Sequence, residues 1–262
     1  MPSPGENYFF ISSLAKGIKV LEILSEKDAL TVSDVARQLG ANRASSHRFL
    51  ATLRELGYVQ QVQDKRYRLT FKLFEMGFRF ANRFEIREVA RPYLQELSLA
   101  FNETVNLGYL DGLDVLHIDK IDGREILRVD SPLGSRAPVY CTALGKAMLS
   151  VMPQDELHNL LDRLVLKKQG PNTITSIKIL IKELDKTRKR GFAVDDCEMA
   201  AGLRCIAAPV YDHTGRASHA ISVSGPALRI TNERLEEIHP VVRRVGRELS
   251  EKLGYSVFKN EA

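Results

Sequence analysis

Residues 31–57 read TVSDVARQLGANRASSHRFLATLRELG, and this stretch decides the fold of the N-terminal part of the chain. It begins with a predicted short helix that ends at Gly40, because glycine readily adopts the left-handed conformation of a helix end. Asn42 is then a suitable N-cap for a second helix. Each helix has an apolar face at helical spacing, formed by Val32, Val35, Ala36 and Leu39 in the first and by Phe49, Leu50, Leu53 and Leu56 in the second. The stretch therefore predicts a helix-turn-helix.

The opposite face of the second helix carries cations and hydrogen-bonding groups. Such a face fits the major groove of DNA, where arginine can read guanine and hydroxyl groups can contact bases or phosphates. We therefore predict DNA contacts from the starts of both helices and from this face: Thr31, Asn42, Arg43, Ala44, Ser45, His47, Arg48 and Thr52.

Residues 58–70 support this interpretation. They contain two β-prone runs around Asp64 and Lys65, which predict a hairpin, and Lys65, Arg66 and Arg68 would bring positive charge to DNA phosphates. Residues 31–70 hold seven Lys and Arg against three Asp and Glu, a net +4 of the +5 of the whole chain. The alternative is a small helical hairpin with a solvated charged face. The order of helix, glycine turn, polar-faced helix and basic hairpin favours a winged helix-turn-helix.

Composition is that of a globular protein, with 262 residues, 44% hydrophobic and 27% charged, long enough for two domains. No apolar run reaches membrane-spanning length, and the N-terminus has no signal-peptide pattern. The three cysteines, Cys141, Cys197 and Cys205, are scattered and odd in number, so we expect neither a disulfide framework nor a zinc site. These features predict a cytoplasmic protein without membrane association, metal or cofactor.

The periodicity along the chain predicts an α+β organisation. We expect a disordered N-terminus (1–11), a winged helix-turn-helix domain (12–70), a linker helix (71–84), a mixed domain around one sheet (85–255) and a C-terminal tail (256–262). The helix at 12–25 would pack Leu14, Ile18, Leu21 and Leu24 behind the reading helices. The linker helix is apolar on more than one face, which predicts burial by its own domain and by a partner subunit.

In the second domain, turn signals and alternation predict strands at 104–110, 114–121, 126–129, 192–195, 204–211 and 217–224. Helical spacing predicts helices at 86–101, 140–151, 153–163, 176–190 and 231–254.

Several stretches in the same order resemble IclR-type bacterial transcriptional regulators over residues 12–255. They are RFLATL (48–53), LGY (56–58), YRLTFKL (67–73), PVYCTALGKA (138–147), GFAVDDCEMAAGLRCIAAPV (191–210) and ISVSGP (221–226). The resemblance implies a dimer, often a dimer of dimers, with a GAF-like C-terminal domain whose antiparallel-type sheet is flanked by helices and which binds small organic acids from catabolism. The chain departs from the family at Ala44, where a hydroxyl residue is common, and at Ser46, which lies toward the core where an aliphatic residue is common.

The resemblance also implies an effector pocket, formed by Ile126, Val129, Ala143, Leu144, Asp195, Leu203, Cys205, Ser222 and Ser224. From the residues themselves, Ser222 and Ser224 share one strand face, and a helix starting near 141–146 would favour an anion at its amino end. The alternative is that the serines satisfy backbone groups while Leu203 and Cys205 belong to the core. Asp195 fits an anionic ligand if it accepts from a ligand hydroxyl or is protonated on burial.

An enzyme is the other class considered. The sequence has no nucleophile elbow, phosphate-binding loop or dinucleotide fingerprint, and its six histidines lack metal-ligand spacing. His117 and Asp119 suggest an acid–base pair, but we interpret them as surface polar residues of an amphipathic strand. We therefore predict a sequence-specific regulator of catabolic genes, a repressor that binds operator DNA and a small organic acid. The alternatives are an activator of the same family and a DNA-binding protein without a ligand switch.

Overall fold

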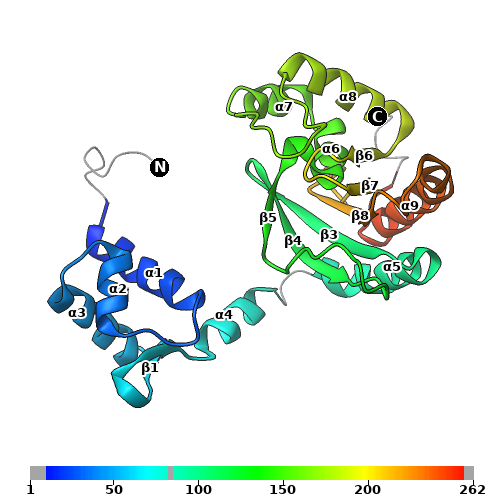
Figure 1. Cartoon of the computed structure of the whole chain (residues 1–262). Coiled ribbons are helices and arrows are strands. Elements are labelled where there is room, and N and C mark those ends of the chain that lie inside the picture. Colours follow the sequence, from blue (N-terminus) through cyan, green and yellow to red (C-terminus); the bar gives the residue numbers. More distant parts are fainter. Residues whose placement is uncertain (1–9, 82–84, 257–262) are drawn as a thin grey trace. The chain divides into compact units, whose positions relative to one another are not determined.

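The computed structural model describes residues 10–81 and 85–256, which fall into two compact units, one on each side of the Phe84–Glu85 bond (Figure 1). The expectations for residues 1–9 and 257–262, and for the end of the linker helix at 82–84, lie outside the described residues.

The first unit is a winged helix-turn-helix, as predicted. Its elements are α1 (Ser12–Ser25), α2 (Val32–Leu39), α3 (Arg43–Glu55), β1 (Val59–Gln61), a 3-10 turn (Gln63–Lys65), β2 (Tyr67–Leu69) and α4 (Lys72–Ala81). The hairpin turns where the sequence indicates, with Asp64 and Lys65 in the left-handed region at φ 60° and 57°. The strands β1 and β2 pair antiparallel.

The core of this unit corrects one expectation for α1. The helix buries Val20, Ile23 and Leu24 against α2 and α3, whereas Leu14 and Ile18 are 59% and 51% exposed. The prediction that Leu14 and Ile18 pack behind the reading helices is therefore wrong. The helix has apolar residues on two faces, and only one of them fits against its neighbours.

The second unit contains one six-stranded antiparallel sheet in the order β5-β4-β3-β8-β7-β6, which confirms the predicted α+β class. The strands are β3 (Thr104–Asp111), β4 (Asp114–Ile121), β5 (Arg136–Pro138), β6 (Ala193–Asp196), β7 (Leu203–Val210) and β8 (His219–Pro226).

The predicted strand at 126–129 is wrong, because these residues form a loop and the edge position is taken by β5. Side chains hold the loop through its carbonyl groups. Arg229 Nη2 donates to the Leu127 carbonyl at 2.8 Å, and Thr104 Oγ1 donates to the Val129 carbonyl at 3.0 Å. The backbone groups that a strand would use are thus bonded elsewhere.

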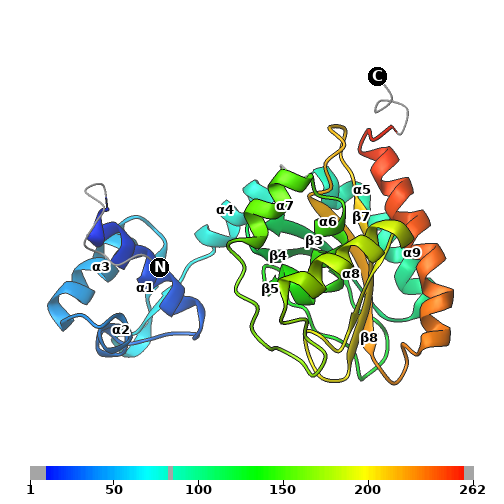
Figure 2. The same ribbon diagram turned by 90° about the horizontal axis from the view of Figure 1, so that it is seen from above.

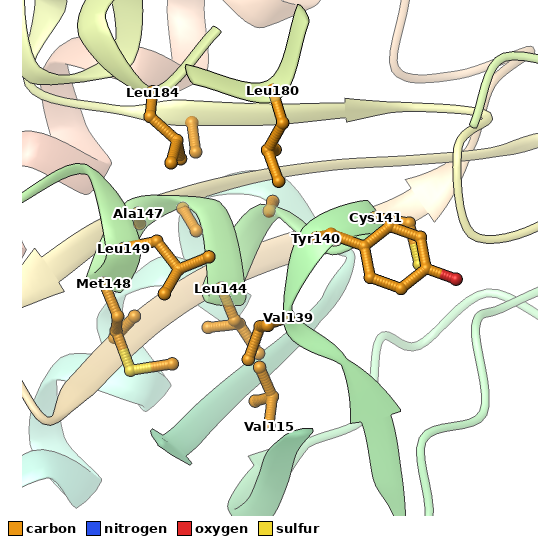
Figure 3. Packing of buried hydrophobic residues seen from close by; sticks show 14 of the residues in the cluster. Val115, Val139, Tyr140, Cys141, Leu144, Ala147, Met148, Leu149, Leu180 and Leu184 are labelled. Atoms are coloured by element: carbon orange, nitrogen blue, oxygen red, sulfur yellow. The ribbon is translucent and has the colours of Figure 1, made fainter. Parts of the chain in front are cut away.

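Helices cover both faces of the sheet (Figure 2). One face packs against α5 (Glu85–Phe101) and α9 (Asn232–Lys252), and the other against α6 (Ala143–Ser150). Two more helices, α7 (Gln154–Leu161) and α8 (Ile177–Arg190), join α6 in the apolar core on its side of the sheet. Figure 3 shows Leu180 and Leu184 of α8 in this core.

The helix predicted at 140–151 is divided in two. A 3-10 turn (Val139–Cys141) precedes Thr142, which is extended at φ −111° and begins α6 by accepting from the Gly145 N–H at 3.1 Å. Gly145 lies so close to the preceding turn that a β-carbon there would approach the Val139 carbonyl oxygen to 2.2 Å. A glycine is therefore required for α6 to begin where it does.

Candidate functional sites

Local hydrogen bonds set the starts of α2 and α3. Thr31 Oγ1 accepts from the Asp34 N–H at 3.2 Å while Asp34 Oδ2 accepts from the Thr31 N–H at 3.3 Å, a reciprocal cap on α2. The hydrogen bond from Thr31 lowers the pKa of Asp34. Gly40 ends α2 at φ 63°, and Asn42 Oδ1 then accepts from the Ser45 N–H at 2.8 Å. Thr31 and Asn42, both predicted to contact DNA, thus also position α2 and α3.

The outer face of α3 presents two arginines and a histidine without side-chain partners among the described residues. Arg43, His47 and Arg48 are exposed, and their side chains make no hydrogen bond or ion pair with any other described residue. The hydroxyl of Thr52, in contrast, donates to the Arg48 carbonyl at 3.0 Å and is already satisfied within the helix. Ser46 is fully buried, as its core position predicts, and donates to the Asn42 carbonyl at 3.1 Å.

Six of the eleven residues predicted to contact DNA line one hollow of about 940 Å³, between the start of α2, the outer face of α3 and the hairpin turn. The predicted residues that line it are Thr31, Arg43, Ala44, His47, Arg48 and Lys65. Ser33 and Gln61 also line it and were not predicted, although both are exposed polar residues next to predicted ones. The other five predicted residues lie outside the lining: Asn42, Ser45, Thr52, Arg66 and Arg68. Arg66 Nη2 is 3.5 Å from Asp64 Oδ2, and Arg68 lies against the Gln60 amide.

The second candidate site is a cavity of about 630 Å³ on the α6 side of the sheet. It brings together eight of the nine residues predicted for the effector pocket: Val129, Ala143, Leu144, Asp195, Leu203, Cys205, Ser222 and Ser224. Ile126 does not line it and is 99% exposed, because the loop that replaces the expected strand turns this side chain to solvent. Ile126 is therefore not part of the pocket.

The register of the strands explains how residues that are far apart in the sequence meet in the wall of this cavity. Asp195, Cys205 and Ser224 lie opposite one another on β6, β7 and β8, and Ser222 follows two residues before Ser224. The serine hydroxyls are 3.5 Å apart, and Asn106 Nδ2 donates to Ser224 Oγ at 3.3 Å. These hydroxyls contact side chains rather than the backbone groups that the alternative interpretation requires.

Asp195 is buried beside the cavity. Its Oδ1 accepts from the N–H groups of Glu198 and Met199 at 2.7 and 3.3 Å. Burial raises the pKa of Asp195 to about 7, although the two N–H groups favour the carboxylate. The side chain therefore changes charge near neutral pH, in line with the expectation that burial favours its protonated form. Glu198 in turn forms a buried ion pair with Lys146 of α6.

The amino end of α6 completes the wall with Thr142, Ala143 and Leu144. The backbone N–H groups of a helix start carry partial positive charge and favour an anion. Arg128, exposed on the loop after β4, also lines the cavity and was not predicted. The wall thus combines neutral donors with the cations Arg128 and Arg136 and with the carboxyl groups of Asp130 and Asp195.

The structure corrects the predicted surface positions of His117 and Asp119. His117 lines the cavity and is 8% exposed, and Asp119 is 3% exposed, so the prediction that both are surface residues is wrong. A bulge at Ile118 pairs His117 with Gly108 and Asp119 with Leu107, which turns the two side chains to opposite faces of the sheet. Asp119 instead accepts from Arg91 of α5 at 2.7 Å. The apolar Val115, two residues before His117, is the signal that this strand face is buried.

Two protein-family models match this chain. The IclR helix-turn-helix domain matches residues 13–63, and the bacterial transcriptional regulator IclR C-terminal domain matches residues 78–251. The chain belongs to the IclR family of bacterial transcriptional regulators.

Characterised relatives of this IclR-family chain align over nearly its whole length. The HTH-type transcriptional regulator KdgR of Escherichia coli is 36% identical over 94% of both chains. The acetate operon repressor of Salmonella typhimurium is 32% identical over 92% of this chain and 89% of its own. The crystal structure of Thermotoga maritima IclR is 36% identical, covers 94% of this chain and 100% of its own, and superposes with a TM-score of 0.82.

These relatives are transcriptional regulators rather than enzymes, which confirms the predicted class. No helix in the described part of the chain is both long and apolar enough to cross a bilayer.

Proposed function

We propose that this IclR-family regulator represses catabolic genes and that a small organic acid, bound in the cavity of the second unit, controls its affinity for operator DNA. The observation that carries the proposal is the cavity itself, because its mostly apolar wall holds a few polar groups that suit an anion, and because it lies in a different unit from the DNA-reading helix. As a regulator of bacterial genes, the protein would act in the cytoplasm, where the DNA is.

The acid would bind with its carboxylate at the amino end of α6. The hydroxyls of Ser222 and Ser224 provide neutral donors there, and the helix start provides partial positive charge. Leu203 and Cys205 supply apolar surface for the carbon chain. Asp195 can share a proton with a ligand hydroxyl or carry the proton itself, which removes its repulsion from the anion.

A homodimer would bring two reading helices to one DNA site. Leu14 and Ile18 of α1, Phe71 before α4 and Phe74 within it are 59%, 51%, 82% and 66% exposed, an unusual amount of large apolar surface for a small unit. A second copy of the chain would cover them. The dimer would read two half-sites about 10 base pairs apart or a multiple of this, and the family resemblance extends the expectation to a dimer of dimers.

The first experiment tests DNA binding. Purified protein is used to select the sequences that it binds from a random double-stranded DNA library. We expect enrichment of one two-fold symmetric site, and organic acids added afterwards should change the affinity for that site. Transcription from a promoter that overlaps the site should fall when the protein binds. Increased transcription would identify an activator, and an affinity that no acid changes would identify a DNA-binding protein without a ligand switch.

The second experiment tests acid binding with the variants Ser222→Ala and Ser224→Ala. Each substitution should weaken binding of the acid by about 1–2 kcal/mol, because a charged ligand loses one neutral donor. Operator affinity without ligand should stay unchanged, because neither residue lies in the DNA-reading unit. Calorimetry measures the first quantity and fluorescence anisotropy at matched salt the second. Unchanged acid affinity in both variants would place the carboxylate elsewhere.

A further inference from the structure

The helix α8 carries a row of lysines along its outer side. Its inner side packs Leu180 and Leu184 into the core, and the helix lies on the outside of the second unit (Figure 1). Positions three or four apart share one face of a helix. Four exposed lysines follow this spacing and form what we call the lysine row: Lys178, Lys182, Lys186 and Lys189. The row extends over about 16 Å of helix.

The acids of α8 do not neutralise this row. The helix holds six Lys and Arg against two acids, Glu183 and Asp185, a net +4. Both acids pair with arginines of the same helix. Arg188 Nη1 is 3.1 Å from Asp185 Oδ1, and Arg190 Nη2 is 2.8 Å from Glu183 Oε1. The side chains of the four lysines make no hydrogen bond or ion pair with any other described residue, so the surplus charge of α8 lies in the lysine row.

The lysine row is unfavourable for the helix that carries it. Like charges at these spacings repel each other. Lys178 also lies in the first turn, where the helix dipole disfavours a cation. The surface of α9 is different, because this helix holds five Lys and Arg against five Asp and Glu. It pairs several of them along its length, for example Arg244 with Glu248 at 3.1 Å. A solvated helix of this chain thus balances its charges, whereas α8 does not.

We infer that the lysine row of α8 binds the phosphate backbone of DNA, as a second contact that adds to the winged helix-turn-helix. Duplex DNA carries one phosphate charge for every 1.7 Å or so of its axis, so a length of about 16 Å presents roughly ten of them to the row. The lysine ammonium is a point charge that binds phosphates without reading bases. The contact is therefore independent of sequence. This inference goes beyond the proposed function and does not depend on the acid.

DNA is favoured over other polyanions because this regulator already holds DNA through its first unit. Once α3 is bound, the rest of the same DNA molecule is present at a high local concentration around the protein. Four lysines then add affinity even though their contacts are weak by themselves. An anionic membrane or an acidic protein has matching charge, but the lysine row would have to capture either of them alone.

The test removes charge from the row and measures the salt dependence of DNA binding by the full-length protein. The variants are Lys182→Gln with Lys186→Gln, and the substitution of all four lysines by Gln. Glutamine is about as good a helix former as lysine, and the loss of repulsion should leave α8 at least as stable. Thermal denaturation checks that each variant is folded.

The DNA is a linear duplex of scrambled sequence of about 300 base pairs, twice the persistence length, so that the protein can reach more than one segment of it. Mobility shift at several salt concentrations gives the slope of log affinity against log salt. Each lost phosphate contact lowers the magnitude of this slope by about 0.9. We expect the double variant to lower it by about 1–2 and to weaken binding about threefold or more at low salt, and the fourfold variant to lower both further.

Arg124→Gln with Lys252→Gln is the matched control. It removes two positive charges from the same unit, one in the loop after β4 and one at the end of α9. Both side chains are exposed, and neither has a hydrogen bond or ion pair with another described residue. The control should keep the slope and the affinity of the wild type, because the lost charges lie outside the lysine row.

The outcomes distinguish a DNA contact from other roles of the row. A lower slope in the α8 variants, with the control unchanged, supports the inference. An unchanged slope in the fourfold variant overturns it, as does an equal fall in the control or a wild type that does not bind scrambled DNA at low salt. Binding to phosphatidylserine vesicles that requires the row, with an unchanged DNA slope, would assign α8 to membranes instead. A DNA affinity that no acid changes contradicts the proposed function and leaves this inference in place.

Discussion

At the scale of single residues, we expect the exposed arginines on the outer face of α3 to make sequence-specific DNA contacts. Arg43 is exposed without a side-chain partner among the described residues, and it lines the hollow beside Lys65 of the hairpin turn. Replacing Arg43 by Ala should weaken binding to the selected operator by about 1–3 kcal/mol if the guanidinium reads a guanine. Fluorescence anisotropy with operator and scrambled DNA measures this difference.

Lys65→Gln is the comparison for that experiment. A phosphate contact from the turn would lower affinity for operator and scrambled DNA alike and reduce the salt dependence by about one charge. Normal operator binding by Arg43→Ala, together with complete loss in Lys65→Gln, would contradict the assignment of α3 to the groove.

Asp195 makes stability depend on pH. Its pKa is raised to about 7 in the folded protein, above the unfolded value near 3.8, so the folded state holds the proton more tightly. The stabilisation is therefore complete below about pH 4 and is lost as pH rises through about 7. Asp195→Asn should remove a pH-dependent contribution on the order of a few kcal/mol at most.

The measurement is urea denaturation of wild type and Asp195→Asn at several values between pH 5 and 8. The difference between the two proteins isolates Asp195 from other titrating groups such as His117. A difference that stays constant across this range would show that Asp195 is ionised throughout.

At the scale of elements, the amino end of α6 depends on Gly145. A β-carbon there would approach the Val139 carbonyl oxygen to 2.2 Å, so Gly145→Ala must displace the helix start from the preceding turn. We expect this substitution to lower the free energy of unfolding by about 1–3 kcal/mol and to weaken acid binding, because Thr142, Ala143 and Leu144 at this helix start line the cavity.

Gly17→Ala provides the control within a helix. A β-carbon at Gly17 in α1 meets no atom within 4 Å, so the change should be neutral or stabilise the protein by up to about 1 kcal/mol. Thermal and urea denaturation of both variants give the comparison. Equal stability of the two alanine variants would mean that α6 can shift without penalty.

At the scale of the whole molecule, the exposed apolar residues of the first unit predict a homodimer. Leu14 and Ile18 lie one helical turn apart on α1 and are both more than half exposed, so charge there should not disturb the core of the unit. Leu14→Glu together with Ile18→Glu should convert the dimer to a monomer and abolish cooperative operator binding.

Light scattering at micromolar concentration measures the mass of both proteins. Val165→Glu introduces one such charge at a residue that is 70% exposed in the second unit, and it should leave the mass unchanged. A monomeric wild type would contradict the proposed dimer directly.

Local interactions explain what the sequence by itself determined. Some features depend only on neighbours within a few residues, so they can be predicted from the sequence alone. They are the helix caps at Thr31 and Asn42, the left-handed Gly40, and the turn at Asp64 and Lys65. The same holds for the helical spacing in α8 and α9, whose observed bounds lie within two residues of the predicted ones.

Tertiary structure decided the features that depend on distant partners. Residues 126–129 have the composition of a strand, but Arg229 and Thr104 bond their carbonyls and leave Ile126 in solvent. The bulge at Ile118 places His117 in the cavity, and strand register brings Asp195 opposite Cys205 and Ser224. The physical reason is that burial and strand pairing are set by residues up to about 120 positions away, as the bond from Asn106 to Ser224 illustrates, whereas caps and turns are set by their immediate neighbours.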